Sequence, residues 1–444
     1  MSAILMPRLS FSYDLNDTTE IYGGIGKFSG GNPNVWYSNI WSNDGVSNIQ
    51  LSLRNVDMFA TPMCDGRTGL PSTQGPGYGV PCSMVDAVVN GSTAGGTNSI
   101  DPSFEIPSVT KTAIGVIKTF SIGHEGGGFI YIPDVVLTAD YIKASAENSA
   151  QVRSIGSTYT GQTDFAGLPI YNDNGRQDFE LGNSLLDGES DSYSISLSKQ
   201  FENVYLTLGY AGIDTTEVSP MTSAVAYSNF TNIASNDPNN PPLANSNYNI
   251  PKRFTGTLRW TPDVFSGLRT KVSLYWTHQK GRPYSYSMDN FTHGLNPSFN
   301  DFYLLYVPVS ATDSNVEFSS SFPVDDFFAW ADAKGLERGS FVSRNDQDSS
   351  WFSKLDLKVS QELPSFRDGD YLEVYAVVRN LTNLLDDKKG VFKEASFPRR
   401  QNVVRAVYND DGKYEYQRFY GSDDSTLVNS PSQYLIKLGF EYKF

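Results

Sequence analysis

The chain has 444 residues and a formal charge of −15, and it contains no apolar run of the roughly 18 residues that a transmembrane helix needs. The acidic balance excludes a nucleic-acid binder, which needs a basic face to displace counterions. Aromatic residues reach 13%, with 26 Tyr and 27 Phe, whereas His falls to 3 and Cys to 2. This composition is typical of strands and turns and argues against a mainly helical protein.

Apolar and polar residues alternate with a period of two from the first predicted strand onward. Residues 8–15 place four apolar side chains on one face, Leu9, Phe11, Tyr13 and Leu15. Asn16-Asp17 then forms a turn, and a Gly-rich strand follows over 19–28. The clearest hairpin spans 192–211. Its first strand has serines at every second position on one face and mainly apolar residues on the other, and the apolar face resumes after the turn at Glu202-Asn203. Such alternation predicts strands with one apolar and one polar face.

Later segments repeat the pattern, with apolar stripes over 254–260, 272–276, 355–359 and 372–378. These segments run roughly 9–12 residues, the length that a tilted strand needs to cross a bilayer, whereas strands in soluble sheets average about 5–6 residues. We predict about 12–14 strands of this kind. Their apolar residues are hidden in alternation, which accounts for a negative mean hydropathy in a membrane protein.

Short and long connections alternate along the chain. Short turns are predicted at 16–17, 123–128, 202–203, 262–267 and 365–369, and long polar excursions at 29–105, 148–190, 212–250, 281–350 and 386–431. A transmembrane barrel has short periplasmic turns on one rim and long external loops on the other. The asymmetry predicts an all-β fold, an antiparallel transmembrane β-barrel with long external loops and short periplasmic turns.

The last predicted strand carries the sharpest local pattern. Its apolar face comprises Tyr434, Ile436, Leu438, Phe440, Tyr442 and Phe444. A terminal strand with one wholly apolar, aromatic-rich face suits a surface in contact with lipid. The alternative is an ordinary amphipathic strand that ends in Phe by chance.

Several segments together resemble the C-terminal barrel of TonB-dependent receptors, in particular the Oar-like branch. These segments are 30–36 (Gly-Gly-Asn-Pro-Asn-Val-Trp), 282–286, 304–308, 343–345, 351–364 and 379–385. The terminal aromatic strand is similar to the assembly signal of outer-membrane proteins. The resemblance implies residence in the Gram-negative outer membrane, recognition by the barrel-assembly machinery and energy-coupled uptake of a large nutrient whose identity the sequence does not give.

Members of that family carry a signal peptide, a TonB-contacting segment and a plug before a barrel of about 22 strands. The start of this chain, Met1 to Leu5, lacks the features of a signal peptide, and neither a plug nor enough strands is found. We therefore expect residues 1–444 to be the C-terminal part of a receptor barrel, with TonB engaged only through a missing N-terminal region. The alternatives are a passive porin-like channel and a soluble secreted β-rich binding or adhesin protein.

No catalytic, cofactor or metal site is predicted, and we expect no enzymatic activity. His124 lies in a Gly-rich turn, His278 ends a strand, and His293 lies in a long loop without a partner at ligand spacing. The acidic residues do not repeat the spacing of a calcium loop; they are Asp301, Asp325, Asp326, Asp410, Asp411, Asp423 and Asp424.

The two cysteines, Cys64 and Cys82, lie in the same long loop among prolines and glycines. Under the membrane interpretation this loop is outside the cell, where oxidation favours a disulfide. Two free thiols or a two-ligand metal remnant are the alternatives.

Loop aromatics form a further group of expected exposed residues, Trp36, Trp41, Tyr78, Tyr227, Tyr284, Tyr286, Phe327, Phe328 and Trp330. They do not define a binding site, because interface girdles and loop packing explain the same residues.

Overall fold

The computed structural model describes residues 4–29, 33–45, 56–90, 96–125, 130–265, 267–295, 301–364, 367, 369–421 and 426–444. Its largest element is a 12-stranded antiparallel sheet. Eleven of these strands follow one another in chain order, namely β1 (Arg8–Asn16), β2 (Thr19–Phe28), β6 (Ser108–Ile122), β7 (Ile132–Glu147), β12 (Glu189–Gln200), β13 (Val204–Glu217), β15 (Arg253–Trp260), β16 (Thr270–Gln279), β22 (Phe352–Leu363), β23 (Tyr371–Arg379) and β28 (Leu435–Lys443). The twelfth, β14 (Ala244–Asn245), pairs with the end of β13 off this path.

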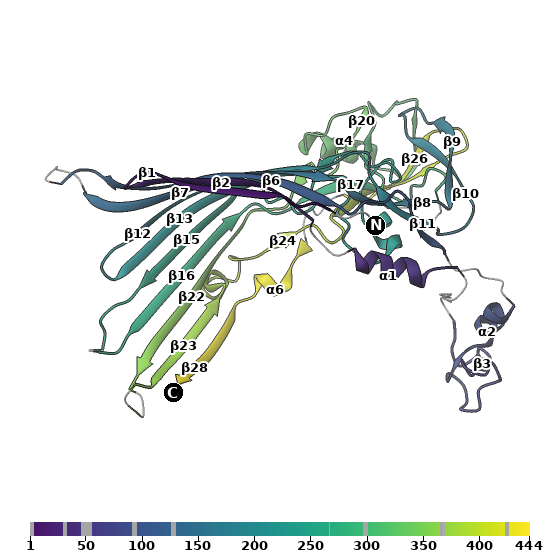
Figure 1. Cartoon of the computed structure of the whole chain (residues 1–444). Helices are drawn as coiled ribbons and strands as arrows, with labels where there is room; N and C mark the ends of the chain where they lie inside the picture. The colour runs from purple at the N-terminus through teal and green to yellow at the C-terminus, as the bar shows by residue number, and fades with distance from the viewer. Residues whose placement is uncertain are drawn as a thin grey trace.

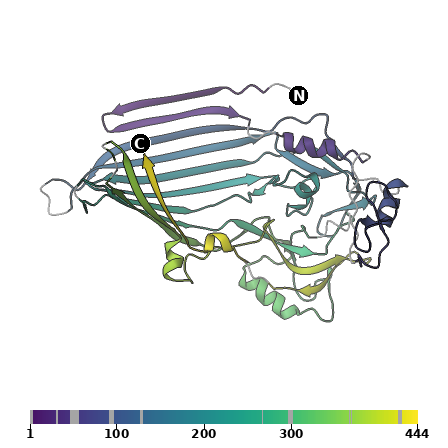
Figure 2. The same cartoon turned by 90° about the horizontal axis from the view of Figure 1, so that it is seen from below.

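The sheet is open and curled. The first strands, β1 to β7, lie nearly flat, and the later strands sweep away from them so that β23 and β28 stand at an angle to β1 (Figures 1 and 2). The eleven strands on the path range from 8 residues in β15 to 16 in β7, as predicted for strands longer than those of soluble sheets. The predicted all-β class, a partial antiparallel barrel, is therefore confirmed by the topology.

The predicted alternation of connections is also confirmed. At one end of the sheet the connections cover only 17–18, 123–131, 201–203, 261–269 and 364–370. At the other end they cover 29–107, 148–188, 218–252, 280–351 and 380–434. Parts of three short turns (126–129, residue 266, and residues 365, 366 and 368) and the first residues of the 30–36 motif lie outside the described residues.

Strand register aligns the apolar stripes into continuous rows. One row crosses six strands through Leu206, Leu258, Leu274, Leu357, Val378 and Ile436. A row on the opposite face runs through Ser196, Gly209, Thr255, Thr277 and Lys354. Because side chains alternate between the faces of a strand, this register gives the sheet one mainly apolar face, interrupted by Lys118 and Lys199, and one polar face.

The five long connections fold at one end of the sheet into what we call the cap, from which residues 56–90 project (Figure 1). Its largest sheet contains β17 (Pro283–Asp289), β19 (Val316–Phe318), β21 (Gln347–Asp348), β25 (Arg400–Tyr408) and β26 (Tyr414–Phe419). A second sheet joins β5 (Asn98–Ile100), β8 (Ala150–Ser154) and β11 (Phe179–Asn183). Four two-stranded sheets complete it: β3 (Met63–Cys64) with β4 (Val80–Pro81), β9 (Ser157–Thr163) with β10 (Pro169–Asp173), β18 (Tyr306–Val307) with β20 (Ser340–Phe341), and β24 (Lys393–Glu394) with β27 (Thr426–Leu427).

The cap also contains the helices, which are α1 (Asn34–Ser42), α2 (Cys82–Val89), α3 (Ala226–Thr231), α4 (Val324–Ala333), α5 (Leu381–Leu385) and α6 (Asn429–Ser432). None of the helices in the described ranges has the length and apolar character to cross a membrane.

The hydrophobic core of the described residues lies in the cap and not in the sheet. All of the largest fully buried side chains come from the long connections; they are Phe230, Tyr286, Met288, Phe291, Leu295, Phe302, Tyr303, Leu305, Phe327, Tyr414 and Tyr416. The apolar face of the sheet remains exposed, with Leu438 on β28 as one example. A soluble protein would bury such a face to remove its apolar area from water.

Candidate functional site

The polar face is the concave side of the sheet. On β16 the exposed fraction is 37% for Trp276 but 3% for its neighbour Thr277, and on β23 it is 37% for Val374 but 4% for Glu373. In a curled sheet the side chains converge on the concave side and cover one another, whereas they splay apart on the convex side. The difference therefore places the polar side chains inside the curve and the apolar side chains outside it.

Hydrogen bonds and ion pairs between strands of the sheet, some of them across an intervening strand, line this concave face. Tyr22 Oη donates to Asp140 Oδ1 at 2.5 Å, and Ser194 Oγ donates to the other carboxylate oxygen of Asp140 at 3.2 Å. Further along the sheet, Lys271 Nζ lies 3.0 Å from Glu373 Oε2. The face thus carries satisfied charges of both signs, as does the interior of a barrel that holds water.

Gly115 on β6 permits one of these contacts. A Cβ atom at this position would lie 2.5 Å from Cζ of Tyr22 and 2.7 Å from Oδ1 of Asp140. Only a residue without a side chain therefore lets the Tyr22 ring lie across β6 and reach Asp140 on β7.

A buried polar cluster holds the cap together, with Asp164 at its centre. The Asp164 carboxylate accepts hydrogen bonds from the Tyr414 hydroxyl and from the backbone N–H groups of Ala166 (2.9 Å) and Leu168 (2.8 Å). His293, whose side chain is fully buried, places Nε2 3.3 Å from Asp164 Oδ2, close enough for an ion pair but not aligned for a hydrogen bond. Asp164, His293 and Tyr414 come from three different long connections.

The local electrostatics favour an ionised Asp164. Burial by itself would raise the pKa of this carboxyl, but His293, the Tyr414 hydroxyl and the Leu168 amide outweigh it, so the pKa is lowered. Burial, followed by the hydrogen bond to Asp164, raises the pKa of Tyr414 well above its ordinary value. The cluster therefore holds one carboxylate surrounded by neutral phenols and an imidazole.

A second set of contacts joins the connection 218–252 to this cluster. Tyr171 Oη donates to Asp237 Oδ1 at 2.8 Å, and the Tyr171 backbone N–H donates to the carbonyl of His293 at 3.0 Å. The backbone N–H of Leu304, in the same connection as His293, donates to Asn236 Oδ1 at 3.0 Å. Because these residues come from the connections 148–188, 218–252 and 280–351, the cap folds as one body and not as separate loops.

His293 and its neighbours were not found by sequence reasoning. Asp164 and Tyr414 are 250 positions apart, so no local spacing joins them to each other or to His293. The other two histidines behave as ordinary polar residues: His124 is exposed in the turn after β6, and His278 stacks on Trp351 with ring centroids 4.6 Å apart. Within the described ranges, no group of three or more His, Cys, Asp or Glu residues is placed to hold a metal ion.

The acidic residues considered for calcium have other surroundings. Asp301 pairs with Arg400 at 2.7 Å, and Asp325 and Asp326 occupy the first turn of α4, where they favourably oppose the helix dipole. Asp410 and Asp411 lie in the turn between β25 and β26. Asp423 and Asp424 lie outside the described residues.

The 343–345 motif joins the cap to the end of β13. The buried Arg344 donates from Nη1 to the carbonyl of Val218 at 2.6 Å and from Nη2 to the carbonyl of Glu217. Burial lowers the pKa of Arg344 to about 10, so it remains charged at neutral pH. Next to it Asn345 adopts φ 57° and donates to the Asn245 carbonyl and to Asn247 Oδ1.

We expect Arg344→Met to loosen this junction. The substitution keeps most of the side-chain volume but leaves two buried carbonyl groups without their charged donor, which costs roughly 1.5–3 kcal/mol per lost charged hydrogen bond. Amide hydrogen exchange should accelerate in 218–252 and 340–348 and stay unchanged in the β1–β2 hairpin. Unchanged exchange at 218–252 would contradict the anchoring role.

The 379–385 motif closes the last long connection. Asn380 takes a left-handed conformation with φ 53° immediately before α5. Its side-chain amide donates to the carbonyls of Gly390 (2.8 Å) and Ser432 (3.2 Å). Asn tolerates this backbone conformation better than most residues, so a single residue both turns the chain and ties both ends of the connection together.

The terminal strand lies at one edge of the sheet as β28. On its predicted apolar face, the side chains of Tyr434, Ile436, Leu438, Phe440 and Phe444 are exposed. Tyr442 shares this side, pairs in register with Leu372 and donates a hydrogen bond to Asp370.

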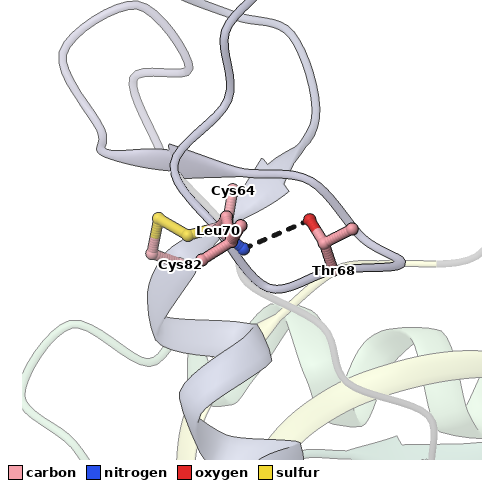
Figure 3. The surroundings of a disulfide bond; sticks show 4 residues. All are labelled: Cys64, Thr68, Leu70 and Cys82. Atoms are coloured by element: carbon pink, nitrogen blue, oxygen red, sulfur yellow. Dashed lines mark hydrogen bonds between the residues drawn. A yellow bond between two sulfur atoms is a disulfide. The ribbon is translucent and has the colours of Figure 1, made fainter.

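Cys64 and Cys82 form a disulfide with a Cα–Cα distance of 4.9 Å (Figure 3). It joins β3 to the start of α2 in residues 56–90, which we call the arm. Asp65 Oδ1 organises the same turn by accepting from the Arg67 and Thr68 amides, and Leu70 N donates to Thr68 Oγ1 at 3.4 Å (Figure 3).

Removing the disulfide by Cys64→Ser with Cys82→Ser should loosen the arm alone. The bond closes a loop with a sequence separation of 18, which in the chain-entropy model contributes about 3 kcal/mol of local order. Hydrogen exchange should therefore rise across 57–90, while the peptides that contain Tyr303 and Tyr414 keep their protection. Loss of protection in those cap-core peptides would show that the arm supports the cap.

The expected exposure of the nine loop aromatics is wrong for seven of them. Tyr284, Tyr286, Phe327 and Phe328 are buried in the core of the cap, and Trp36, Tyr227 and Trp330 pack against that core. Only Trp41 (82% exposed) and Tyr78 (61% exposed) project into solvent. The reason is that the long connections pack on one another, which supplies them with a core that a mobile polar loop would lack.

Comparison with known proteins gives a fold-level likeness only. No protein-family model matches the sequence, and no curated protein matches it. Among solved structures, the outer membrane transporter YddB from Escherichia coli matches with a TM-score of 0.44 and 14% sequence identity. The match covers 99% of this chain and 40% of that chain, so this chain spans well under half the length of that transporter.

Proposed function

We propose that this chain is the C-terminal part of a TonB-dependent receptor barrel, of the Oar-like branch, in the Gram-negative outer membrane. The observation that carries the proposal is the division of the sheet into a continuous apolar convex face and a polar concave face. Hydrocarbon on the convex side and water on the concave side satisfy both faces, whereas water on both sides would leave the Leu206-to-Ile436 row exposed.

The one-sided placement of the long connections supports an orientation. In outer-membrane barrels the long loops face the outside of the cell and the short turns face the periplasm. The cap and the disulfide arm would then lie outside the cell, in an oxidising compartment where a disulfide persists. A large nutrient would be received by the cap and conducted along the polar face.

Partners follow from this placement. Outer-membrane lipid contacts the convex face, and the terminal strand offers the barrel-assembly machinery an exposed edge. Energy coupling would come through an N-terminal region of the kind that the family carries before its barrel. The chain itself would perform no catalysis, and its role would be binding and transport.

Fractionation of the full chain tests the membrane assignment. The chain, supplied with a cleavable secretion leader and expressed in a Gram-negative host, should sediment with outer membranes and resist extraction at alkaline pH. A monodisperse protein in plain buffer would overturn the proposal and favour a secreted binding protein.

Conductance measurements distinguish the receptor barrel from a passive porin-like channel. A passive channel predicts discrete, stable conductance steps when the purified chain is added to a planar bilayer. The receptor assignment predicts no such steps from residues 1–444, because the sheet of the described residues is open.

A further inference from the structure

A small hollow opens on the concave face of the sheet. It has a volume of about 300 Å³ and is lined by residues of β7, β12, β13 and β15, together with Ile250 from the connection before β15. This volume lies at the lower end of the range for sites that hold small molecules. None of the lining residues belongs to the Asp164 cluster, so the hollow is a separate feature of the molecule.

The strand register sets a charged row along the hollow. Asp140 on β7, Ser194 on β12, Ala211 on β13 and Arg253 on β15 are successive register partners, so they form one row across four strands. The row has an acid at one end, a base at the other end and two short side chains between them. These short side chains leave the space that the hollow occupies.

Both charged residues have capacity for a further partner. Asp140 accepts hydrogen bonds from Tyr22 and Ser194, which fill two of the roughly four acceptor positions of an ionised carboxylate. Arg253 donates from Nη2 to Tyr275 Oη at 3.4 Å, and its guanidinium carries further N–H donors. Within the ranges that the structure describes, neither residue forms an ion pair. The row therefore offers one anionic and one cationic contact to a bound molecule.

An aliphatic row lies beside the charged row, two residues nearer the cap on each strand. Ile142, Ser192 and Ile213 are register partners on β7, β12 and β13, and Ile250 also lines the hollow. Ile142 is 39% exposed although it stands on the polar face of the sheet. Aliphatic side chains in this position gain free energy when a ligand removes them from water.

The distance along the charged row fits a short peptide. Three strand spacings separate the backbones of Asp140 and Arg253, roughly 14 Å at about 4.8 Å per spacing. The two side chains take up the outer part of this distance, and an extended dipeptide covers about 7 Å. A zwitterionic dipeptide therefore fits between them, with its ammonium group at Asp140 and its carboxylate at Arg253.

We propose that the hollow is a binding subsite for a short aliphatic peptide. Asp140 contacts the ammonium group, Arg253 contacts the carboxylate, and Ile142 and Ile213 cover the aliphatic side chains. This inference rests on the proposed function, because it names a substrate class for a barrel that conducts nutrients along its polar face. A fatty acid would leave Asp140 without a cation, and a fully polar solute would leave the isoleucines in water.

Calorimetric titration of the full chain in detergent tests the subsite, with leucylleucine as the probe. Three related compounds each lack one recognised feature: the C-terminal amide lacks the carboxylate, the N-acetyl form lacks the ammonium group, and glycylglycine lacks the aliphatic side chains. We expect each to bind at least about tenfold more weakly, as is usual when a charged hydrogen bond or a buried side chain is lost. Equal binding of any of them, equal binding of octanoate, or no binding of leucylleucine would overturn the proposal.

Variants assign the contacts to named residues. Arg253→Gln should weaken leucylleucine about tenfold and abolish its preference over the C-terminal amide, because the group that distinguishes the two is gone. Asp140→Asn should likewise abolish the preference over the N-acetyl form. Arg259→Gln is the matched control, since Arg259 lies on the same face of β15 but in register with Tyr205 and Ser273, outside the hollow. A preference that survives in Arg253→Gln, or an equal loss in Arg259→Gln, would overturn the proposal.

The subsite and the membrane assignment fail in different ways. Selective binding of leucylleucine by a chain that is monodisperse in plain buffer would overturn the membrane assignment and support the subsite. A chain that fractionates with outer membranes but binds leucylleucine and its amide equally would overturn the subsite alone.

Discussion

Asp164→Ala should destabilise the cap by about 3–5 kcal/mol, the usual cost of removing one partner from a buried, hydrogen-bonded pair. The substitution leaves the Tyr414 hydroxyl and the Leu168 amide without their acceptor. Amide exchange in the peptides around His293 and Tyr414 should accelerate by roughly 10²- to 4 × 10³-fold, since each 1.4 kcal/mol is worth about a factor of ten.

The pH dependence gives a second readout of the same carboxylate. Its pKa in the folded protein is below the value in the unfolded chain, so its contribution is fully present above the unfolded value of about 4 and is lost as pH falls through the folded value. Cap stability of the parent protein should therefore decline below about pH 4, and Asp164→Asn should remove part of that decline. An equal decline in the variant would assign it to other carboxylates.

Leu208→Arg should cost about 2–4 kcal/mol in a lipid bilayer, because it places a charge on the convex face near the middle of β13. Leu208 is 53% exposed and stands in register between Leu197 and Gly256. The same change on the surface of a water-soluble protein would fall within about 0.5 kcal/mol. Urea unfolding of the chain in lipid vesicles measures the difference.

Thr207→Arg is the matched control for this charge. Thr207 is the preceding residue on β13 and faces the polar side, in register with Ser198 and Thr257. The control should change the free energy of unfolding little, since the guanidinium would reach water on the concave side. Equal effects of the two arginines would remove the distinction between the faces on which the membrane assignment depends.

Local sequence patterns were sufficient to predict the sheet. Alternation assigns each residue of β12 and β13 to a face without reference to any distant contact, because a strand has a side-chain period of two. Short turns such as 201–203 fix the register of the hairpins that they join. The terminal pattern from Tyr434 to Phe444 predicted β28 for the same reason.

The cap could not be predicted in this way. Its long connections are rich in polar residues, which is typical of loops. The pattern of their aromatic residues does not indicate whether these face inward. Phe327 and Tyr286 are buried only because α4 and β17 pack against β25 and β26 from a connection more than 50 residues further along. The residues that form such contacts are far apart in the sequence, so no local periodicity predicts that they meet.

By itself, then, the sequence determined the strands, their two faces and the alternation of turns and excursions, since these depend on residues that are neighbours in the chain. Tertiary structure alone decided that the excursions share one core and that Asp164 meets His293 and Tyr414. Those features depend on which distant segments the fold brings together and on which buried groups remain to be paired, and both are properties of the whole fold.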